Sequence, residues 1–499
     1  MLKLTKLSLL LLFILLVQKK LYAQVFNSET IHVEGVVIDK NSGNGLPYTN
    51  IYVLHNSVGV ISNENGFYSL NVQNLELTDT LRFQYVGYQD FNITIGGLKQ
   101  NADVELLEKV NTLGEMLIFG APPNPKSIVK KVLVNQALNY ETSSRQQNVF
   151  IRERENQDIK ELEIDYERSS LNTIDASLFK EIEQKVSKDI TWYTDFLGNA
   201  YFSKNEEGKN LFKINPIKVI SLQEEDFGDT KDIEKIVTDL AKETYEEQYW
   251  KIKTGIFSQK INLENDSTED SLADGSQKLK YYRSNMFTEF KFQSFENENH
   301  WEFLHKTGKY DYTLVGGSRV NNENVYIIDF VPDGSGIYQG RLIIAFDNYA
   351  LIRADFNYAE GKTGRDINIL GVGYSQNQFE GSIFFEKQNS KYHLKYLSKQ
   401  DEVSYSVERK ISLLKKQERW LFDKELEEIK LGLNLAIKNL SSVEILVLET
   451  DLITLKEYNN IEQQKLMQVI YVDQFNDELW EGFSIIQPTK QMKTYTKTP

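Results

Sequence analysis

The segment between residues 31 and 107 alternates short strand-like stretches with residues that turn the backbone. Residues 33–39 place side chains in the period of two that a strand requires. The run Asn-Ser-Gly-Asn-Gly at residues 41–45 supplies the positive-φ positions of a turn, and Asn65-Gly66 favours a tight hairpin. About seven strands in about eighty residues is the spacing of a β-sandwich, which we expect over residues 30–108. The other predicted strands are residues 51–54, 67–70, 81–86, 91–95 and 104–106.

The same segment carries a specific set of motifs. Together they resemble the carboxypeptidase-regulatory-like domain, over about a sixth of the chain. The resemblance implies a transthyretin-like sandwich of the kind common in envelope proteins of Bacteroidetes-type bacteria. The motifs are Gly35-x-Val37-x-Asp39, Gly45-Leu46-Pro47-x-x-Asn50-Ile51-x-Val53, Gly59-x-x-Ser62, Gly66-x-Tyr68 and Phe83-x-Tyr85-Val86-Gly87-Tyr88.

The first residues predict the compartment. Lys3 and Lys6 precede an apolar run that extends from Leu7 to Val17, and a small residue follows at Ala23. A basic start, an apolar core of about 7–15 residues and a small residue at the cut are typical of a secretory signal. The apolar run is shorter than the ~20 residues of a membrane-spanning helix. We therefore expect residues 1–23 to be a signal peptide, and the chain to be exported to the periplasm or to associate with the outer membrane.

The amino-acid composition excludes several kinds of functional site and partner. The chain has no cysteine, so it has no disulfide, no thiolate metal site, no cysteine nucleophile and no lipidated cysteine. It has 57 basic and 72 acidic residues, a net charge of -15, which repels nucleic acid and anionic lipid. We therefore expect no nucleic-acid partner. No stretch after the signal is long and apolar enough to be a transmembrane helix.

A second region follows a proline-rich boundary. Residues 109–124 are expected to be a linker, since Asn124 can cap a helix and Pro125 suits its first position. Apolar residues at helical spacing predict helices near residues 125–139 and 232–250. Most of the remainder resembles strands, so we expect a β-rich domain over residues 125–490.

The clearest strand pattern in this domain is a meander at residues 325–330, 338–346 and 351–358. One face of each strand is apolar and the other mixes apolar with charged residues. We expect the apolar face to be fully covered and Arg–Asp pairs to join strands on the mixed face. The predicted apolar face consists of Tyr326, Ile328, Phe330, Leu342, Ile344, Phe346, Ile352, Ala354, Phe356 and Tyr358, and the charges are Asp329, Arg341, Asp347, Arg353 and Asp355.

The larger region also resembles uncharacterised regions that follow this sandwich in the same bacteria. In general shape these regions resemble the strongly curved antiparallel sheet of lipoprotein-carrier proteins, a fold analogy that carries no function by itself. We therefore expect a mainly β protein with a few helices, in which a seven-stranded sandwich precedes a larger antiparallel, curved-sheet domain. The matching motifs are Asn139-Tyr140, Phe150-Ile151-Arg152-Glu153, Gly340-Arg341-Leu342-x-Ile344, Asp347-x-x-x-Leu351-Ile352-Arg353 and a closing motif at residues 477–488.

Motifs that could carry chemistry are incomplete. A zinc peptidase site needs a histidine with glutamate three residues later and a distant histidine, and none of the five histidines meets this rule. His300 and His305 are expected to lie in a strand. Gly361-Lys362-Thr363 lacks the upstream glycine of a phosphate loop, and the acidic run at residues 266–275 has Leu272 where calcium needs an oxygen ligand. We expect no catalytic, cofactor-binding or metal-binding residue.

Three functions remain open. The first is non-catalytic binding, scaffolding or assembly in the cell envelope, with the sandwich as a docking module for an envelope protein or for an apolar or glycan ligand. The second is a periplasmic carrier of an apolar ligand, such as a lipid or an acylated peptide, on the curved sheet. The third is an unrecognised hydrolase. An apolar, concave cavity favours the carrier, and a buried cluster of titratable groups favours the hydrolase.

A receptor of the TonB-dependent class is a fourth candidate, because residues 113–118 resemble the segment that joins this sandwich to the receptor plug. Such a receptor needs a large barrel of alternating, lipid-facing strands. Only about 380 residues follow, and they include helical stretches and a charged segment at residues 415–430. We therefore expect no such receptor.

Overall fold

The structure is a computed structural model, and the description covers residues 31–54, 59–72, 76–98, 103–109, 123–222, 247–255, 257–261, 276–320 and 323–495. The predicted signal peptide, most of the predicted linker and the acidic run at residues 266–275 lie outside these ranges. Among the described residues, 56% lie in strands and 16% in helices, which confirms the mainly β class. Within the described ranges we find no helix with the length and apolar character needed to cross a bilayer.

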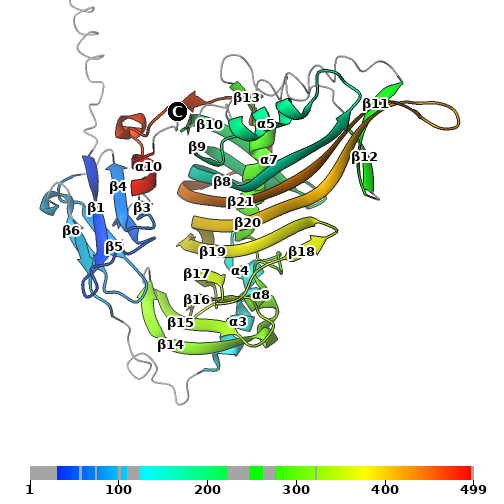
Figure 1. Ribbon diagram of the computed structural model, residues 1–499. Helices are drawn as coiled ribbons and strands as arrows, with labels where there is room; N and C mark the ends of the chain where they lie inside the picture. The colour runs from blue at the N-terminus through cyan, green and yellow to red at the C-terminus, as the bar shows by residue number, and fades with distance from the viewer. Residues whose placement is uncertain are drawn as a thin grey trace, which may run out of the picture.

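The N-terminal region is the predicted sandwich of seven strands. One sheet has the order β4-β1-β7 and the other the order β3-β2-β5-β6 (Figure 1). The side chains between the sheets are buried, among them Val37, Ile51 and Phe83. The elements are β1 (Ile31–Asp39), β2 (Asn50–Val53), β3 (Gly59–Ile61), β4 (Phe67–Val72), β5 (Thr80–Gln84), β6 (Phe91–Thr94), the 3-10 turn η1 (Ile95–Gly97) and β7 (Val104–Leu106).

Turn residues close this sandwich as the sequence suggests. The Asp39 carboxylate accepts hydrogen bonds from the backbone N–H groups of Asn41 and Ser42, which fixes the first turn. Gly66 has a φ of 85°. A Cβ at this position would lie 2.4 Å from the carbonyl oxygen of Val37, so the close approach of the hairpin to β1 requires glycine.

The larger region is built on one 14-stranded sheet. Its main order is β14-β15-β16-β17-β19-β20-β21-β8-β9-β10-β23, with β11, β12 and β18 attached beside it. The sheet is open, curved and antiparallel apart from the pair β10–β23, which confirms the predicted fold class. Its strands are β8 (Arg145–Ser169), β9 (Asp189–Lys204), β10 (Asn210–Ser221), β11 (Gln248–Thr254), β12 (Phe257–Ile261), β14 (Tyr310–Val320), β15 (Glu323–Pro332), β16 (Tyr338–Ala345), β17 (Leu351–Tyr358), β18 (Asp366–Ile369), β19 (Val372–Gln388), β20 (Lys391–Gln417), β21 (Lys424–Leu452) and β23 (Ile470–Tyr471).

The helices of this region are short. The predicted helix near residues 125–139 is present as α3 (Pro125–Val134) and α4 (Gln136–Asn139). The Asn124 side chain caps α3 by accepting the backbone N–H groups two and three residues on, and Pro125 occupies its first position. The other elements are α5 (Ala176–Lys185), α7 (Leu279–Phe290), η2 (Lys291–Gln293), α8 (Glu302–His305), η3 (Thr307–Lys309), α9 (Leu455–Asn460), η4 (Asp477–Trp480), α10 (Lys490–Lys493) and the separate strand pair β13 (Ser276–Lys278) and β22 (Leu466–Gln468).

Two local predictions are wrong at the residues that the structure describes. The end of the helix predicted near residues 232–250 is strand β11, which pairs with β20, while residues 223–246 lie outside the described ranges. The second correction concerns the histidines expected in a strand, because His300 lies in a turn and His305 ends helix α8. In both places a short apolar pattern fits helix and strand equally well, and tertiary pairing decides between them.

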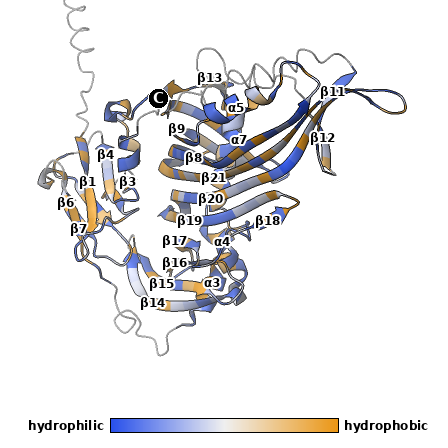
Figure 2. Ribbon diagram, in the orientation of Figure 1, coloured by the Kyte–Doolittle hydropathy of each residue, from blue (hydrophilic) through white to orange (hydrophobic). Residues whose placement is uncertain are grey.

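Three strands of the sheet are unusually long. β8 has 25 residues, β20 has 27 and β21 has 29. Apolar and polar residues alternate along them, as the two colours on these strands show (Figure 2). Their outer parts extend beyond the main body, where a small cluster that includes Ile174, Trp250 and Ile429 packs with side chains of α5. Part of each face of these strands is exposed to solvent. They therefore lack the continuous apolar runs that mark a buried strand.

The meander is confirmed as β15, β16 and β17. Arg341 and Asp329 stand opposite each other and pair across the strands as expected, with 2.6 Å between Nε and Oδ1. One detail of the apolar face differs. A bulge in the pairing of β16 with β17 places Leu351 opposite Ile344, in the position expected for Ile352.

The mixed face of the meander is buried as well, which corrects the expectation that only one face is fully covered. Arg353 is 5% exposed. Its guanidinium donates to Asp355 (2.8 Å) and to the carbonyl oxygen of Tyr48 in the sandwich (3.2 Å), and it lies 5.0 Å from the centre of the Tyr85 ring. The sandwich therefore packs on this face, a contact that the period of two does not encode. We call it the sandwich side of the sheet.

The opposite face is covered by helices, and we call it the helix side. Phe303 of α8 stacks on Phe330 with 4.4 Å between ring centres and lies 4.8 Å from Phe356. Buried residues of the sandwich, of the sheet and of these helices belong to one continuous hydrophobic cluster. The two regions of the chain are thus joined by shared apolar contacts.

Candidate functional site between the sandwich and the sheet

A single row of polar residues crosses the sandwich side from β15 to β9. Each residue stands directly opposite the next in the strand register, one on each of eight strands. Directly paired residues point to the same face of a sheet, so the whole row faces the sandwich side. We call it the polar row. In order across the sheet it consists of Asp329, Arg341, Asp355, Ser382, Ser398, Glu444, Arg152 and Asp195.

The two ends of the polar row have the same chemistry and opposite burial. Arg341 donates to Asp329 through Nε and Nη2, at 2.6 and 2.9 Å, and these side chains are 48% and 41% exposed. Arg152 donates to Asp195 in the same two-point manner, at 2.8 and 2.7 Å, and these side chains are 4% and 0% exposed. Only the Arg152–Asp195 pair is buried. We call it the buried end of the polar row.

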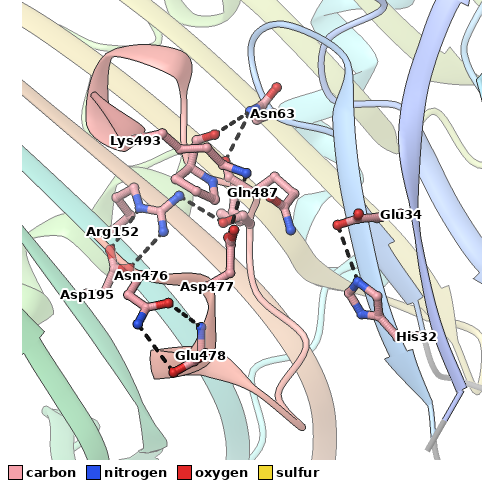
Figure 3. A network of polar contacts seen from close by, with 12 residues as sticks. His32, Glu34, Asn63, Arg152, Asp195, Asn476, Asp477, Glu478, Gln487 and Lys493 are labelled. Carbon is pink, nitrogen blue, oxygen red and sulfur yellow. Dashed lines mark hydrogen bonds and ion pairs between the residues drawn. The ribbon is translucent and has the colours of Figure 1, made fainter. Parts of the chain in front are cut away.

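The C-terminal segment at residues 483–488 covers this buried end (Figure 3). We call it the strap. Arg152 Nη1 donates to the carbonyl oxygen of Ile486 at 2.8 Å. From the sandwich, Asn63 Nδ2 donates to the carbonyl oxygen of Gln487 at 3.1 Å, and Asn71 Nδ2 to that of Phe483 at 2.6 Å. The strap therefore lies between the sandwich and the sheet and is bonded to both.

Beside the strap a cavity of about 330 Å³ opens between the sandwich and the sheet. This volume is at the lower end of the range for pockets that hold small ligands. The walls come from three distant parts of the chain, so a molecule in the cavity would contact both regions at once. The lining residues are Pro47, Tyr48, Glu64, Asn65, Arg152, Arg154, Tyr193, Glu380, Ser398, Gln400, Ser442, Glu444 and Thr489.

Two donors in the cavity wall lack a partner. Tyr193 is 2% exposed, and among the described residues no group accepts from or donates to its hydroxyl. The same holds for the buried Nε of Arg154, which stands opposite Tyr193 in the strand register. Leaving a buried donor without a partner costs about 1–3 kcal/mol. A ligand with acceptor oxygens would recover this free energy.

Two carboxylates lie on the same face of the sheet as these donors. Burial raises the pKa of Glu444, and the charge of Arg152 partly offsets this effect. The hydroxyl of Tyr396 donates to Glu444 at 2.8 Å. Burial also raises the pKa of Glu380, and the charges of Asp355 and Glu64 add to it. The sheet thus presents acceptors and unpaired donors to the cavity from the same face.

A second group of titratable residues lies on the helix side, under α7. Lys399 Nζ is 2.6 Å from Glu289 and 3.6 Å from Asp401. Burial raises the pKa of Glu153 to about 7, and the charges of Glu289 and Glu155 add to this effect. Burial also raises the pKa of Glu155 to about 7. We call these five residues the helix-side cluster.

The helix-side cluster predicts a pH dependence of stability. We expect the double change Glu153→Gln and Glu155→Gln to stabilise the fold at pH 8 by about 1–3 kcal/mol more than at pH 5. The folded carboxyls keep their protons up to a pKa of about 7, whereas 4.5 is the ordinary pKa of glutamate. The folded state therefore binds more protons between these values, and that contribution to stability is lost as the pH rises through the window. Urea melts at both pH values measure it.

The control for this experiment is the same change at Glu161 and Glu163, which are exposed on the outer part of β8. In that variant the change in the free energy of unfolding should be the same at pH 5 and at pH 8. If the change at Glu153 and Glu155 gave the same gain at both pH values, removal of the raised pKa would not be the reason for it.

Sequence reasoning named no site residue, and it missed both polar surfaces. Arg152 entered only as part of a motif, and Tyr193 and Arg154 did not enter at all. The single available signal was the alternation Arg152-Glu153-Arg154-Glu155, in which basic residues face the sandwich side and acidic residues the helix side. For metal ions, the described ranges contain no group of three or more histidine, aspartate or glutamate residues arranged to hold one.

Several solved structures are similar to this chain at low identity. One is described as an outer membrane lipoprotein-sorting protein domain from Vibrio parahaemolyticus, 10% identical over 67% of this chain and 97% of that chain, with a TM-score of 0.23. Another is MucB with MucA from Pseudomonas aeruginosa, 8% identical over 64% of this chain and 93% of that chain, with a TM-score of 0.18. A third, from Bacteroides fragilis, is described as a membrane-associated protein of unknown function, 9% identical over 84% of this chain and 97% of that chain, with a TM-score of 0.13.

These TM-scores are too low to support an inference from those proteins to this one. No curated protein matches the chain. The family model of the CarboxypepD_reg-like domain matches residues 33–118, where β1 to β7 form the sandwich. The resemblance expected from the sequence is therefore confirmed: the chain carries a CarboxypepD_reg-like domain in its N-terminal β-rich region.

Proposed function

We propose that the protein is a non-catalytic binding protein of the cell envelope, which holds a small hydroxyl-rich ligand, such as a glycan fragment, between its sandwich and its curved sheet. The observation that carries the proposal is the cavity beside the strap, with the unpartnered hydroxyl of Tyr193 and the unpartnered Nε of Arg154 in its wall. Sugar hydroxyls both donate and accept, so they complement a wall that offers these donors on the same face as the carboxylates of Glu380 and Glu444.

The proposal also includes the cellular compartment, which is the cell envelope. A basic start, an apolar run and Ala23 support export, and the CarboxypepD_reg-like domain supports a place in the envelope. In this proposal the sandwich packs on the curved sheet of its own chain, and the ligand fills the cavity between them. A partner protein of the envelope would then sense whether the cavity is filled through the exposed surface of the sandwich.

Native mass spectrometry of the protein purified from its own envelope tests this function. We expect a small polar molecule to co-purify with the wild type, and Tyr193→Phe to weaken its retention about tenfold, because one buried hydrogen bond contributes about 1–2 kcal/mol. Tyr405→Phe, at a tyrosine that is 47% exposed on the helix side, is the matched control and should retain the molecule. Equal retention by wild type and Tyr193→Phe would contradict the proposal.

A carrier of apolar molecules is the second candidate, and a specific surface favours it. On the helix side, β18 to β8 present a continuous apolar set across five strands, and several of its members are exposed. An exposed apolar surface of this kind suits a lipid or an acylated peptide. We call it the apolar row, and it consists of Ile367, Ile369, Val372, Tyr374, Tyr405, Val407, Leu435, Ile437, Ile159 and Leu162. If an acylated molecule co-purified and Tyr405→Ser released it, the carrier would replace the polar binding protein.

A hydrolase would use the helix-side cluster, whose raised carboxyl pKa values are typical of catalytic acids. We assign the cluster to a different task. Lys399 bonds to Glu289 of α7 at 2.6 Å, which ties the helix to the sheet and compensates part of the acidic charge. Loss of a hydrolytic activity in Glu153→Gln, with an unchanged fold, would overturn this assignment.

A further inference from the structure

The hairpin between β20 and β21 ends in an exposed apolar tip. Its last paired residues are Gln417 and Lys424. Between them Trp420 is 96% exposed, Leu421 65% and Phe422 81%. The loop lies at the far right of Figure 1, at the opposite end of the molecule from the sandwich. We call residues 420–422 the apolar tip.

The base of this loop is held by hydrogen bonds and ion pairs. The Tyr249 hydroxyl donates to the Asp423 carboxylate at 2.5 Å. Lys260 Nζ bonds to the Glu418 carboxylate at 2.5 Å, and the backbone N–H of Glu418 donates to the carbonyl oxygen of Glu247 at 2.7 Å. Both acidic residues that flank the tip are therefore engaged with neighbouring strands. The apolar tip projects beyond a fixed polar base.

Three adjacent apolar side chains at the end of a hairpin are costly to leave in water. They form a convex projection, and a fluid, apolar medium accepts such a shape without a complementary pocket. Tryptophan in particular favours the boundary between water and lipid, where its ring is buried and its N–H stays near polar groups. The charged residues around Trp420 would remain at the level of the headgroups.

We propose that the apolar tip inserts into the interface of a lipid bilayer and attaches this end of the protein to the membrane surface. The lipid surface is uncharged, because a net charge of -15 repels anionic headgroups. Attachment therefore depends on the three apolar side chains and not on basic residues. The proposal is independent of the cavity, which lies beside the sandwich at the other end of the sheet.

Co-flotation of the full mature chain with phosphatidylcholine–phosphatidylethanolamine vesicles tests the proposal. We expect wild type to float with the vesicles, and the triple variant Trp420→Ser, Leu421→Ser, Phe422→Ser to partition at least tenfold less. The control variant Val134→Ser, Leu138→Ser removes two side chains that are 78% and 72% exposed on the short helices, and it should bind like wild type. Because all five side chains are exposed, both variants keep the fold, which thermal melts verify.

Tryptophan fluorescence gives a second readout. Brominated lipid should quench wild type strongly and Trp420→Phe much less, since Trp250, Trp301 and Trp480 are buried and Trp192 is half-buried on β9. Tyr193→Phe should leave vesicle binding unchanged, so failure of the cavity function and failure of membrane attachment are distinguishable. Three results would overturn the proposal: no flotation of wild type, equal loss in both variants, or binding that occurs only in native membranes, which would indicate a protein partner.

Discussion

Arg152→Ala is expected to lower the free energy of unfolding by about 3–5 kcal/mol, because it leaves a buried charge without its partner. Asp195 is 0% exposed, and both of its carboxylate oxygens accept from Arg152. The change also removes the donor that holds the carbonyl oxygen of Ile486 in the strap. Urea melts at pH 7 measure the loss.

The polar row provides a matched control at its other end. Arg341→Ala breaks an Arg–Asp pair of the same two-point geometry, but that pair is about half exposed and its contribution is about 0–1 kcal/mol. The comparison isolates burial as the variable, since the residue types and the hydrogen bonds are alike. Equal losses in Arg152→Ala and Arg341→Ala would show that the strap does not withdraw the Arg152–Asp195 pair from water.

The contrast between these two pairs also shows what the sequence could predict. The sandwich and the meander were predictable, because their signals are local: alternation, turn glycines and short loops. The pairing of Arg341 with Asp329 followed from the same local pattern. The cap at Asn124 and the proline after it were likewise sufficient to place the start of α3.

The buried end of the polar row was not predictable in this way. Arg152 meets Asp195 across neighbouring strands, and it meets Ile486 across 334 positions of sequence. No local pattern distinguishes Arg152 from Arg154 or from the other charged residues of β8. Charge alternation on a long strand shows which residues share a face, and only the docking of the sandwich and of the strap decides which face is buried.

The meander gives the second large effect. We expect Ile344→Ala to cost about 2–5 kcal/mol, through lost transfer free energy and the cavity that remains. Ile344 is 0% exposed and stands opposite Tyr326 on the helix side of the sheet. Arg353→Ala is expected to cost about 1–3 kcal/mol, more than an open mixed face would imply, because Arg353 bonds to Tyr48 of the sandwich.

Val331→Ala is the control for Ile344→Ala, since Val331 is an apolar residue of the same meander that is 50% exposed. Its cost should stay within about 0.5 kcal/mol, as for most surface changes. Urea melts of the three variants then order them by burial: Ile344→Ala first, Arg353→Ala second and Val331→Ala last. A carrier with its ligand on the meander would give a different result, namely little loss of stability in Ile344→Ala together with release of the ligand. Full burial of Ile344 under the helices predicts the first outcome, because a packed core position responds to truncation through stability.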